Sequence, residues 1–230
     1  MLTEEQLAEV KQEYIDIIKS LKRKDCDIDG FLAYLEDTDF FTAPASTQYH
    51  CSFSGGLCLH SINVYKIMLG MTNRLARKVV DNPKYNPDDK ESTEKPQIKV
   101  PLYSRDSIIL VALLHDLNKV NFYEKTSKNE KDYCDDGKYS DAMGNFNWKT
   151  TVGYKVIDAE NRSLGNKGIT SYLRASMFFA LTEEEMNALI YQYSATDKET
   201  VADLSSILAR YNLSVFLHSA DIIATYCIEK

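Results

Sequence analysis

The stretch that most constrains this chain is VALLHDLNKV, residues 111–120, in which an apolar run ends in His115 and Asp116. Residues 108–114 are apolar almost all round, which is typical of a central helix rather than a surface helix. Burying the charge of Asp116 without a partner would be costly in free energy. We therefore expect a metal ion at the end of this helix, with further ligands supplied from elsewhere in the chain.

Composition limits the classes of function. A chain of 230 residues with 44% hydrophobic and 27% charged residues is ordinary for a soluble globular protein. The net charge of −7 and the pI near 5.2 argue against a broad nucleic-acid-binding surface, which would be basic. No stretch has the pattern of a signal peptide or of a membrane span. We expect a cytoplasmic protein without membrane contact, whose five cysteines, which form no Cys-x-x-Cys pair, are reduced thiols.

Apolar residues recur at helical spacing along most of the chain, so the predicted fold class is all-α. Thr3 with Gln6, and Thr182 with Glu185, have the spacing of capping boxes at helix starts. The predicted helices cover residues 3–21, 29–35, 58–80 and 105–119, the segments that begin near 167 and at 182, and residues 213–228.

Two segments lack the helical pattern. Residues 82–103 carry four of the five prolines and many charges, which predicts a surface loop. Residues 121–157 alternate polar and apolar residues, which predicts a small β-hairpin outside the helical core. No linker divides the chain, and we expect N-terminal helices in residues 1–44 to pack on a core formed by residues 45–230.

Polar residues interrupt the apolar helices at His60, at His115-Asp116 and at Asp221. A single buried histidine is more often a hydrogen-bonded core residue than a metal ligand, and a single aspartate can cap a helix or pair with a lysine. The chain has only four histidines, however, and three of them fall on inward helix faces or at helix ends. Imidazole and carboxylate together suit divalent Zn, Mn, Fe or Mg. These four residues are therefore our predicted ligands for one divalent metal ion of unknown identity.

A second arrangement competes for His60. His50, Cys51, Cys58 and His60 lie within eleven residues, which raises the alternative of a small zinc site. The Cys-x6-Cys spacing is wider than that of the usual zinc knuckle, so this alternative is disfavoured. We therefore assign His60 to the ligand set that contains His115.

Three motifs follow one another along the chain: GGLCLH ending at His60, LLHDLNK around His115-Asp116, and LHSADIIATY around Asp221. They resemble the motifs of the HD-domain superfamily of metal-dependent phosphohydrolases, over residues 45–226. The resemblance implies an HD-domain helical core around the metal site. It also implies hydrolysis of phosphoester bonds, usually in nucleotides, cyclic nucleotides or nucleic acid.

The resemblance favours a hydrolase that acts on a nucleotide or another small phosphorylated compound. Asp116 would then assist the deprotonation of a water molecule at the metal. Lys119 would steady phosphate charge, or alternatively would satisfy the dipole at the end of its helix. Tyr49 and His50 precede the glycine turn and are candidates for substrate binding at the pocket mouth, the alternative being simple packing. His218 would be a further ligand or a partner of one.

The chain departs from many HD hydrolases at two positions. Those relatives carry two more histidines that help to hold a second metal, and the corresponding places here are occupied by Asn166 and Tyr193. Neither an amide nor a neutral phenol replaces imidazole well on a transition metal, so we expect one ion per chain and assign both residues to substrate binding.

Two other functions stay open. The missing histidines leave open an HD module that binds a nucleotide or a partner without turnover. A 3′–5′ exoribonuclease-like activity is the other alternative. It is disfavoured because the chain is acidic and shows no oligonucleotide-binding domain. The sequence does not indicate an oligomeric state.

Overall fold

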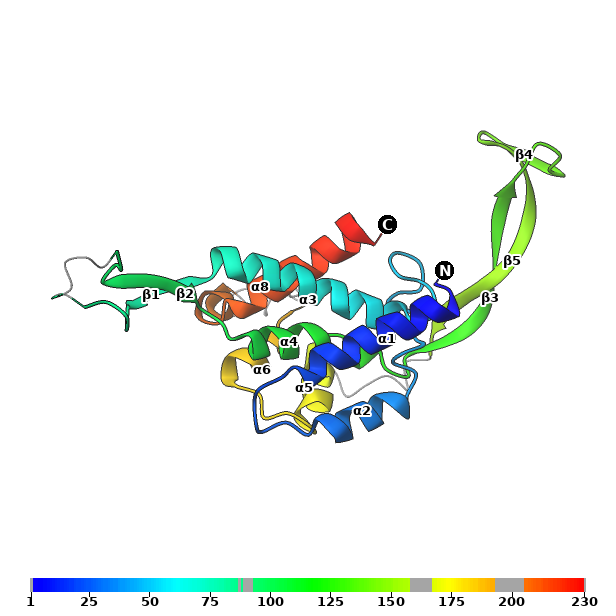
Figure 1. The fold of residues 1–230 in the computed structure, drawn as a ribbon. Coiled ribbons are helices and arrows are strands. Elements are labelled where there is room, and N and C mark those ends of the chain that lie inside the picture. The colour runs from blue at the N-terminus through cyan, green and yellow to red at the C-terminus, as the bar shows by residue number, and fades with distance from the viewer. Residues whose placement is uncertain (1, 87, 89–92, 158–166, 193–204, 230) are drawn as a thin grey trace.

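The structure is a computed structural model that describes residues 2–86, 88, 93–157, 167–192 and 205–229. Figure 1 shows a body of helices from which two β-hairpins project in opposite directions. The strands lie outside the helical body, and the core is formed by residues of the helices and of the loops that join them.

The helical body contains the α-helices whose bounds follow, a further helical stretch over residues 205–210, and two short helices of other kinds. The α-helices are α1 (Glu4–Lys19), α2 (Ile28–Glu36), α3 (Gly56–Leu75), α4 (Arg105–Leu114), α5 (Lys167–Ser176), α6 (Glu183–Ile190) and α8 (Leu213–Ile223). A 3-10 helix, η1 (Leu117–Lys119), follows α4, and a π-helix, η3 (Ala224–Ile228), continues α8. The capping boxes predicted at Thr3 and Thr182 are present. Within the described ranges, every helix is too short or too polar to cross a membrane.

Helix α4 lies at the centre of the body, as its sequence predicts. Every residue from 108 to 114 is buried. Helix α3 packs against both α4 and α8, so the ends of these three helices are brought together. On another side, α1 contacts α3 and α4, and the buried hydroxyl of Tyr14 donates to the carbonyl of Leu113 at 3.0 Å. The N-terminal helix is thus tied to the central helix just before His115.

The described strands form two antiparallel sheets. β1 (Arg77–Asp81) pairs with β2 (Gln97–Pro101). β3 (Tyr123–Tyr133), β4 (Tyr139–Asp141) and β5 (Gly144–Val156) form a three-stranded sheet in the order β3-β5-β4. The hairpin predicted near residues 121–157 is therefore present. It is long, with β3 and β5 paired from Tyr123↔Val156 to Tyr133↔Phe146, and β4 adds a third strand.

The predicted all-α class is wrong, because the fold is mixed: 49% of the residues that the structure describes are helical and 19% are in strands. The predicted helix over 58–80 ends at Leu75, residues 77–81 form β1, and the predicted loop over 82–103 contains β2. Most side chains of the strands are exposed. Hydrophobic patterning reports burial against a core, so it gave little signal for β1 and β2, which stand outside one.

Candidate metal centre

His60 is positioned by the tight turn that starts α3. Gly55, the N-cap residue, has a left-handed backbone with φ of 82°. At Gly56 the backbone passes so close to the loop that a Cβ atom would lie 1.9 Å from the carbonyl oxygen of Cys51. Only glycine fits there. One helical turn later, the fully buried ring of His60 faces the ends of α4 and α8.

His115 is oriented by the last turn of its own helix. Its Nδ1 lies 2.7 Å from the carbonyl oxygen of Ala112. A carbonyl oxygen only accepts hydrogen bonds, so Nδ1 is the donor and Nε2 is the atom presented to the cluster. The backbone oxygen of His115 accepts a bond of 2.7 Å from the side-chain amide of Gln192, which fixes the end of α4.

His60 is oriented in the same way by a residue that the sequence reading missed. Its Nδ1 lies 2.9 Å from Oε2 of Glu229, whose other oxygen accepts a bond of 2.8 Å from the amide of Asn63. A carboxylate behind a histidine is a common device for fixing the ring of a metal ligand. Glu229 follows the π-helix η3. Its one sequence signal was a carboxylate placed directly after an apolar helix, the same signal that singled out Asp116.

Three ligand atoms form a nearly equilateral triangle. The Nε2 atoms of His60 and His115 are 3.3 Å apart, and Oδ2 of Asp116 lies 3.6 Å from the first and 3.4 Å from the second. Nitrogen and oxygen ligands at about 2.0–2.2 Å from a tetrahedral ion would be about 3.3–3.6 Å from one another. The triangle therefore has the size of one face of a metal coordination shell.

Asp221 adds a fourth oxygen from α8. Its Oδ1 lies 3.2 Å from Nε2 of His60, and its side chain is one quarter exposed, whereas those of His60 and Asp116 are buried. The ligand atoms of His60, His115 and Asp116 all lie within 4.8 Å of one another, and Asp221 stands outside that group. Asp221 is thus the member at the solvent side of the cluster.

Lys119 lies inside the site rather than at its edge. Its Nζ is 2.6 Å from Oδ2 of Asp116. Burial alone would raise the pKa of Asp116, but the charges of Lys119 and His115 hold that pKa well below its usual range. Burial would lower the pKa of Lys119, and the charge of Asp116 raises it instead. The site therefore contains an ionised carboxylate and a protonated amine in contact.

The pKa values of His60 and His50 are shifted in opposite directions. Burial acts to lower the pKa of His60, but hydrogen bonds to Asp221 and Glu229 outweigh it and raise that pKa to about 9. Burial and the proximity of His60 lower the pKa of His50 to about 4. The two ring centroids are 4.8 Å apart. Both ring nitrogens of His50 are buried and have no hydrogen-bond partner among the described residues.

The structure thus brings together six of the predicted residues: His50, His60, His115, Asp116, Lys119 and Asp221. Tyr49 is 82% exposed, which leaves it outside the cluster. Among the contacts found in the described ranges, none joins His218 to the cluster. Asn166 and Tyr193 lie outside the described residues.

The disfavoured Cys/His zinc site is not formed by these residues. The thiol of Cys58 points to the backbone oxygen of Val10, at 3.8 Å, on the side of α1. His60 uses its two nitrogens toward Glu229 and toward the cluster with His115.

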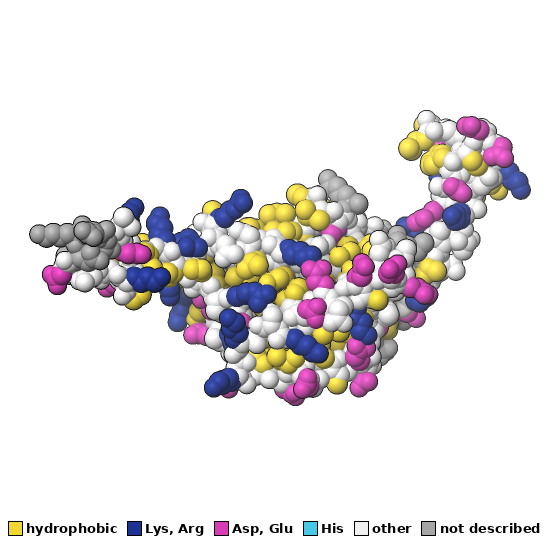
Figure 2. Space-filling view, in the orientation of Figure 1, with side chains coloured by type: hydrophobic (Ala, Val, Ile, Leu, Met, Phe, Trp, Pro, Cys, Tyr) yellow, Lys and Arg dark blue, Asp and Glu magenta, His cyan; other side chains and the backbone are white. Residues whose placement is uncertain are grey.

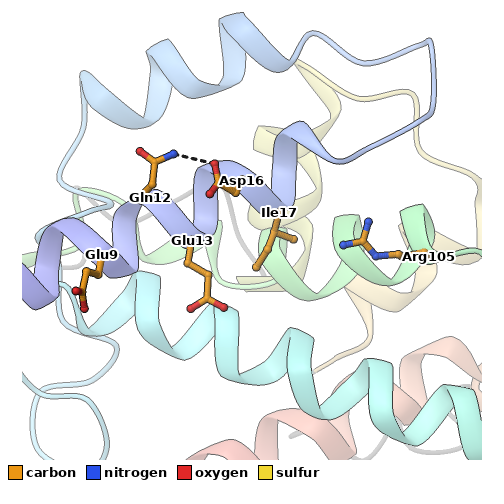
Figure 3. A pocket seen from close by; sticks show the side chains of 6 residues that line it. All are labelled: Glu9, Gln12, Glu13, Asp16, Ile17 and Arg105. Atoms are coloured by element: carbon orange, nitrogen blue, oxygen red, sulfur yellow. Dashed lines mark hydrogen bonds between the residues drawn. The ribbon is translucent and has the colours of Figure 1, made fainter.

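A hollow on the outer surface, shown in Figure 3, is a poor alternative for a phosphorylated ligand. It lies along α1 and the start of α4, and it is lined by Glu9, Gln12, Glu13, Asp16, Ile17 and Arg105. Three carboxylates against one guanidinium would repel an anion. The histidine cluster is the better candidate because its groups are buried and converge.

Comparison of the chain with models of protein families, with curated proteins and with solved structures gives no match. The function proposed next therefore rests on the residues of the cluster and on their geometry.

Proposed function

We propose that this chain is a metal-dependent phosphohydrolase of the HD type, which hydrolyses a phosphoester bond in a nucleotide or another small phosphorylated compound. The observation that supports it best is the buried triangle of His60 Nε2, His115 Nε2 and Asp116 Oδ2, with edges of 3.3–3.6 Å. Asp221 would complete the ligand set from the solvent side.

The donor set suits a divalent metal. Two imidazole nitrogens and two carboxylate oxygens match Zn, Mn, Fe or Mg, and the site leaves the choice among them open. When bound, such an ion would lower the pKa of a water molecule and polarise a phosphoryl oxygen. Glu229 and the carbonyl of Ala112 would hold the two rings in the tautomer that presents Nε2.

Asp116 and Lys119 supply the charges that a phosphate substrate needs. Asp116 stays ionised, so its second role would be to accept a proton from a water molecule beside it. The amine of Lys119 pairs with Asp116 before substrate binds and would donate to a phosphate oxygen when substrate is present. This role is favoured over the helix-dipole alternative, because the amine points to the cluster.

His50 offers the substrate a neutral imidazole. Its lowered pKa, about 4, keeps the ring uncharged at neutral pH, and both of its nitrogens are buried without partners in the described structure. A neutral imidazole has one donor and one acceptor. We assign it to hydrogen bonding with the phosphate or with the group that leaves. Tyr49, being exposed, is not assigned a contact with substrate.

The test combines metal analysis with a substrate panel. The purified chain, loaded with Mn, Zn or Fe, is assayed against nucleotides, cyclic nucleotides, sugar phosphates and single-stranded RNA. We expect bound metal and hydrolysis of a small phosphoester, both lost in Asp116→Asn. Asp16→Asn, which removes a carboxylate from the surface hollow, is the matched control and should keep both. Tight metal binding without turnover of any phosphoester would contradict the proposal and favour a binding module.

A further inference from the structure

The three-stranded sheet of residues 123–156, here called the arm, stands away from the helical body (Figure 1). β3 and β5 pair without interruption from Tyr123↔Val156 to Tyr133↔Phe146. Eleven residues of strand span about 35 Å. A two-stranded ribbon of this length with both faces in water is only marginally stable on its own. Packing one of its faces against another surface would stabilise it.

The strand register sorts the side chains of the arm onto two unlike faces. Tyr133, Phe146 and Tyr139 are opposite one another in the ladder, and Trp148, Val152 and Tyr154 follow at even spacing from Phe146. Side chains two apart on a strand share a face. These six residues therefore lie together and are called the aromatic face. The opposite face carries charged residues, among them the facing pair Glu130↔Lys149.

The aromatic face is only partly covered by its own side chains. Phe146 is 5% exposed, because the rings of Tyr133, Tyr139 and Trp148 lie 5.3–5.7 Å from it. The covering rings themselves remain exposed by 43–52%, and Val152 by 62%. Figure 2 shows hydrophobic side chains gathered at the far end of the arm.

Charge on this face is nearly balanced. Lys131 and Asp141 both lie on it by register and form an ion pair. The amine of Lys131 also lies 4.6 Å above the ring of Phe146. Lys125, near the base, is the remaining charged residue of this face in the strands. Because this face is nearly neutral, two copies of it can pack together without charge repulsion. A face that binds an anionic membrane or a nucleic acid would instead carry an excess of Lys and Arg.

We propose that the aromatic face is the contact surface of a symmetric dimer of this chain. A two-fold dimer uses the same patch on both copies, so a self-complementary apolar face is what it requires. With large side chains about half exposed, each face offers on the order of 500 Å², and two faces together bury on the order of 1,000 Å², the lower end of specific interfaces. Tyr and Trp are also the residues enriched in such contacts.

Sedimentation of the full chain tests this contact. Interfaces of this small size are weak, so we use a concentration of about 100 μM, at which we expect the wild type to have twice the 26.2 kDa mass of the chain. Trp148→Ser combined with Val152→Ser should give the single-chain mass. Glu130→Ser with Lys149→Ser, a charge-neutral change on the opposite face, is the matched control and should remain dimeric.

Trp148 is the only tryptophan, so its fluorescence reports directly on this face. On dilution of the wild type, its emission should move to longer wavelength over the same concentrations at which the mass halves. The single change Val152→Ser should move that midpoint to a concentration at least tenfold higher, while the circular dichroism spectrum stays that of the wild type. A wild type that stays monomeric at 100 μM, or a double variant at Trp148 and Val152 that stays dimeric, would overturn the proposal. Binding of a monomeric wild type to neutral or anionic vesicles, or to RNA, would overturn it as well.

Discussion

The Nε2 atoms of His60 and His115 lie 3.3 Å apart, and each ring is bonded through Nδ1 to an acceptor on its far side. If each ring carried only its Nδ1 hydrogen, two lone pairs would face each other in a buried site. A proton or a cation between them removes this repulsion. Hydrogen bonds to Asp221 and Glu229 raise the pKa of His60 to about 9, so its ring is protonated at neutral pH when no metal is bound. Metal binding would therefore displace a proton.

This exchange predicts the pH dependence of metal affinity. Below the pKa of His60, each ion bound releases one proton, so the zinc affinity should rise about tenfold for each pH unit. Between pH 6 and pH 8 the expected gain is about 100-fold. Competition with a chromophoric chelator at a series of pH values measures it. An affinity that is constant over this range would show that the ring is already neutral in the metal-free chain.

Zinc affinity should rise with pH, whereas the free energy of unfolding of the metal-free chain should fall as the pH rises. The pKa of His60 is raised in the folded state, from 6.5 to about 9, so its protonation stabilises the fold fully below pH 6.5. That contribution is lost as the pH rises through 9. In the presence of EDTA, the free energy of unfolding in urea should fall by on the order of 2 kcal/mol between pH 6.5 and 9. In His60→Gln, most of this difference should disappear.

Glu229 should affect metal binding without touching the metal. In Glu229→Gln the side chain no longer presents a charged acceptor to Nδ1 of His60, and zinc affinity should fall about 10–100-fold. Glu36→Gln, a change in an exposed pair with Lys11, is the control and should bind zinc like the wild type. If the wild type, Glu229→Gln and Glu36→Gln bound zinc with equal affinity, Glu229 would contribute to helix packing and not to metal binding.

The proximity of His60 and His115-Asp116 could be predicted because their signals are local. Each polar residue interrupts an apolar helix, and helical periodicity alone turns it inward. Glu229 has a similar local signal, but it was missed because its contact with His60 depends on how η3 packs against α3. The ion pair of Lys119 with Asp116 likewise depends on the 3-10 turn that follows α4.

The strands were harder to predict for a different reason. β1 carries Val79 and Val80 between charged residues, and the helix pattern of α3 runs into it without a break in hydrophobicity. Its partner β2 lies beyond a charged, proline-rich stretch, and only long-range pairing reveals it. The arm was predicted because its alternation is long, although its length and its aromatic face follow from the register.

Elemental analysis should find one metal ion per chain. A second group, His50, His60 and Glu229, also has ligand atoms close to one another. It would share His60 with the first, and both oxygens of Glu229 are already bonded, to His60 and to Asn63. The first group alone is therefore expected to be filled after saturation with Zn or Mn. A content of two ions that falls to one in His50→Ala would assign the second ion to the other group.

Two glycines in α3 should respond oppositely to alanine. At Gly56 the added Cβ would meet the carbonyl oxygen of Cys51 at 1.9 Å, so the turn before His60 must shift. Gly56→Ala should lower the free energy of unfolding by about 1–3 kcal/mol and weaken zinc binding. At Gly70, in the same helix, the added Cβ meets nothing within 4 Å, and Gly70→Ala should raise stability by about 0.5–1 kcal/mol with unchanged zinc affinity. If Gly56→Ala bound zinc like the wild type, the turn would not be what positions His60.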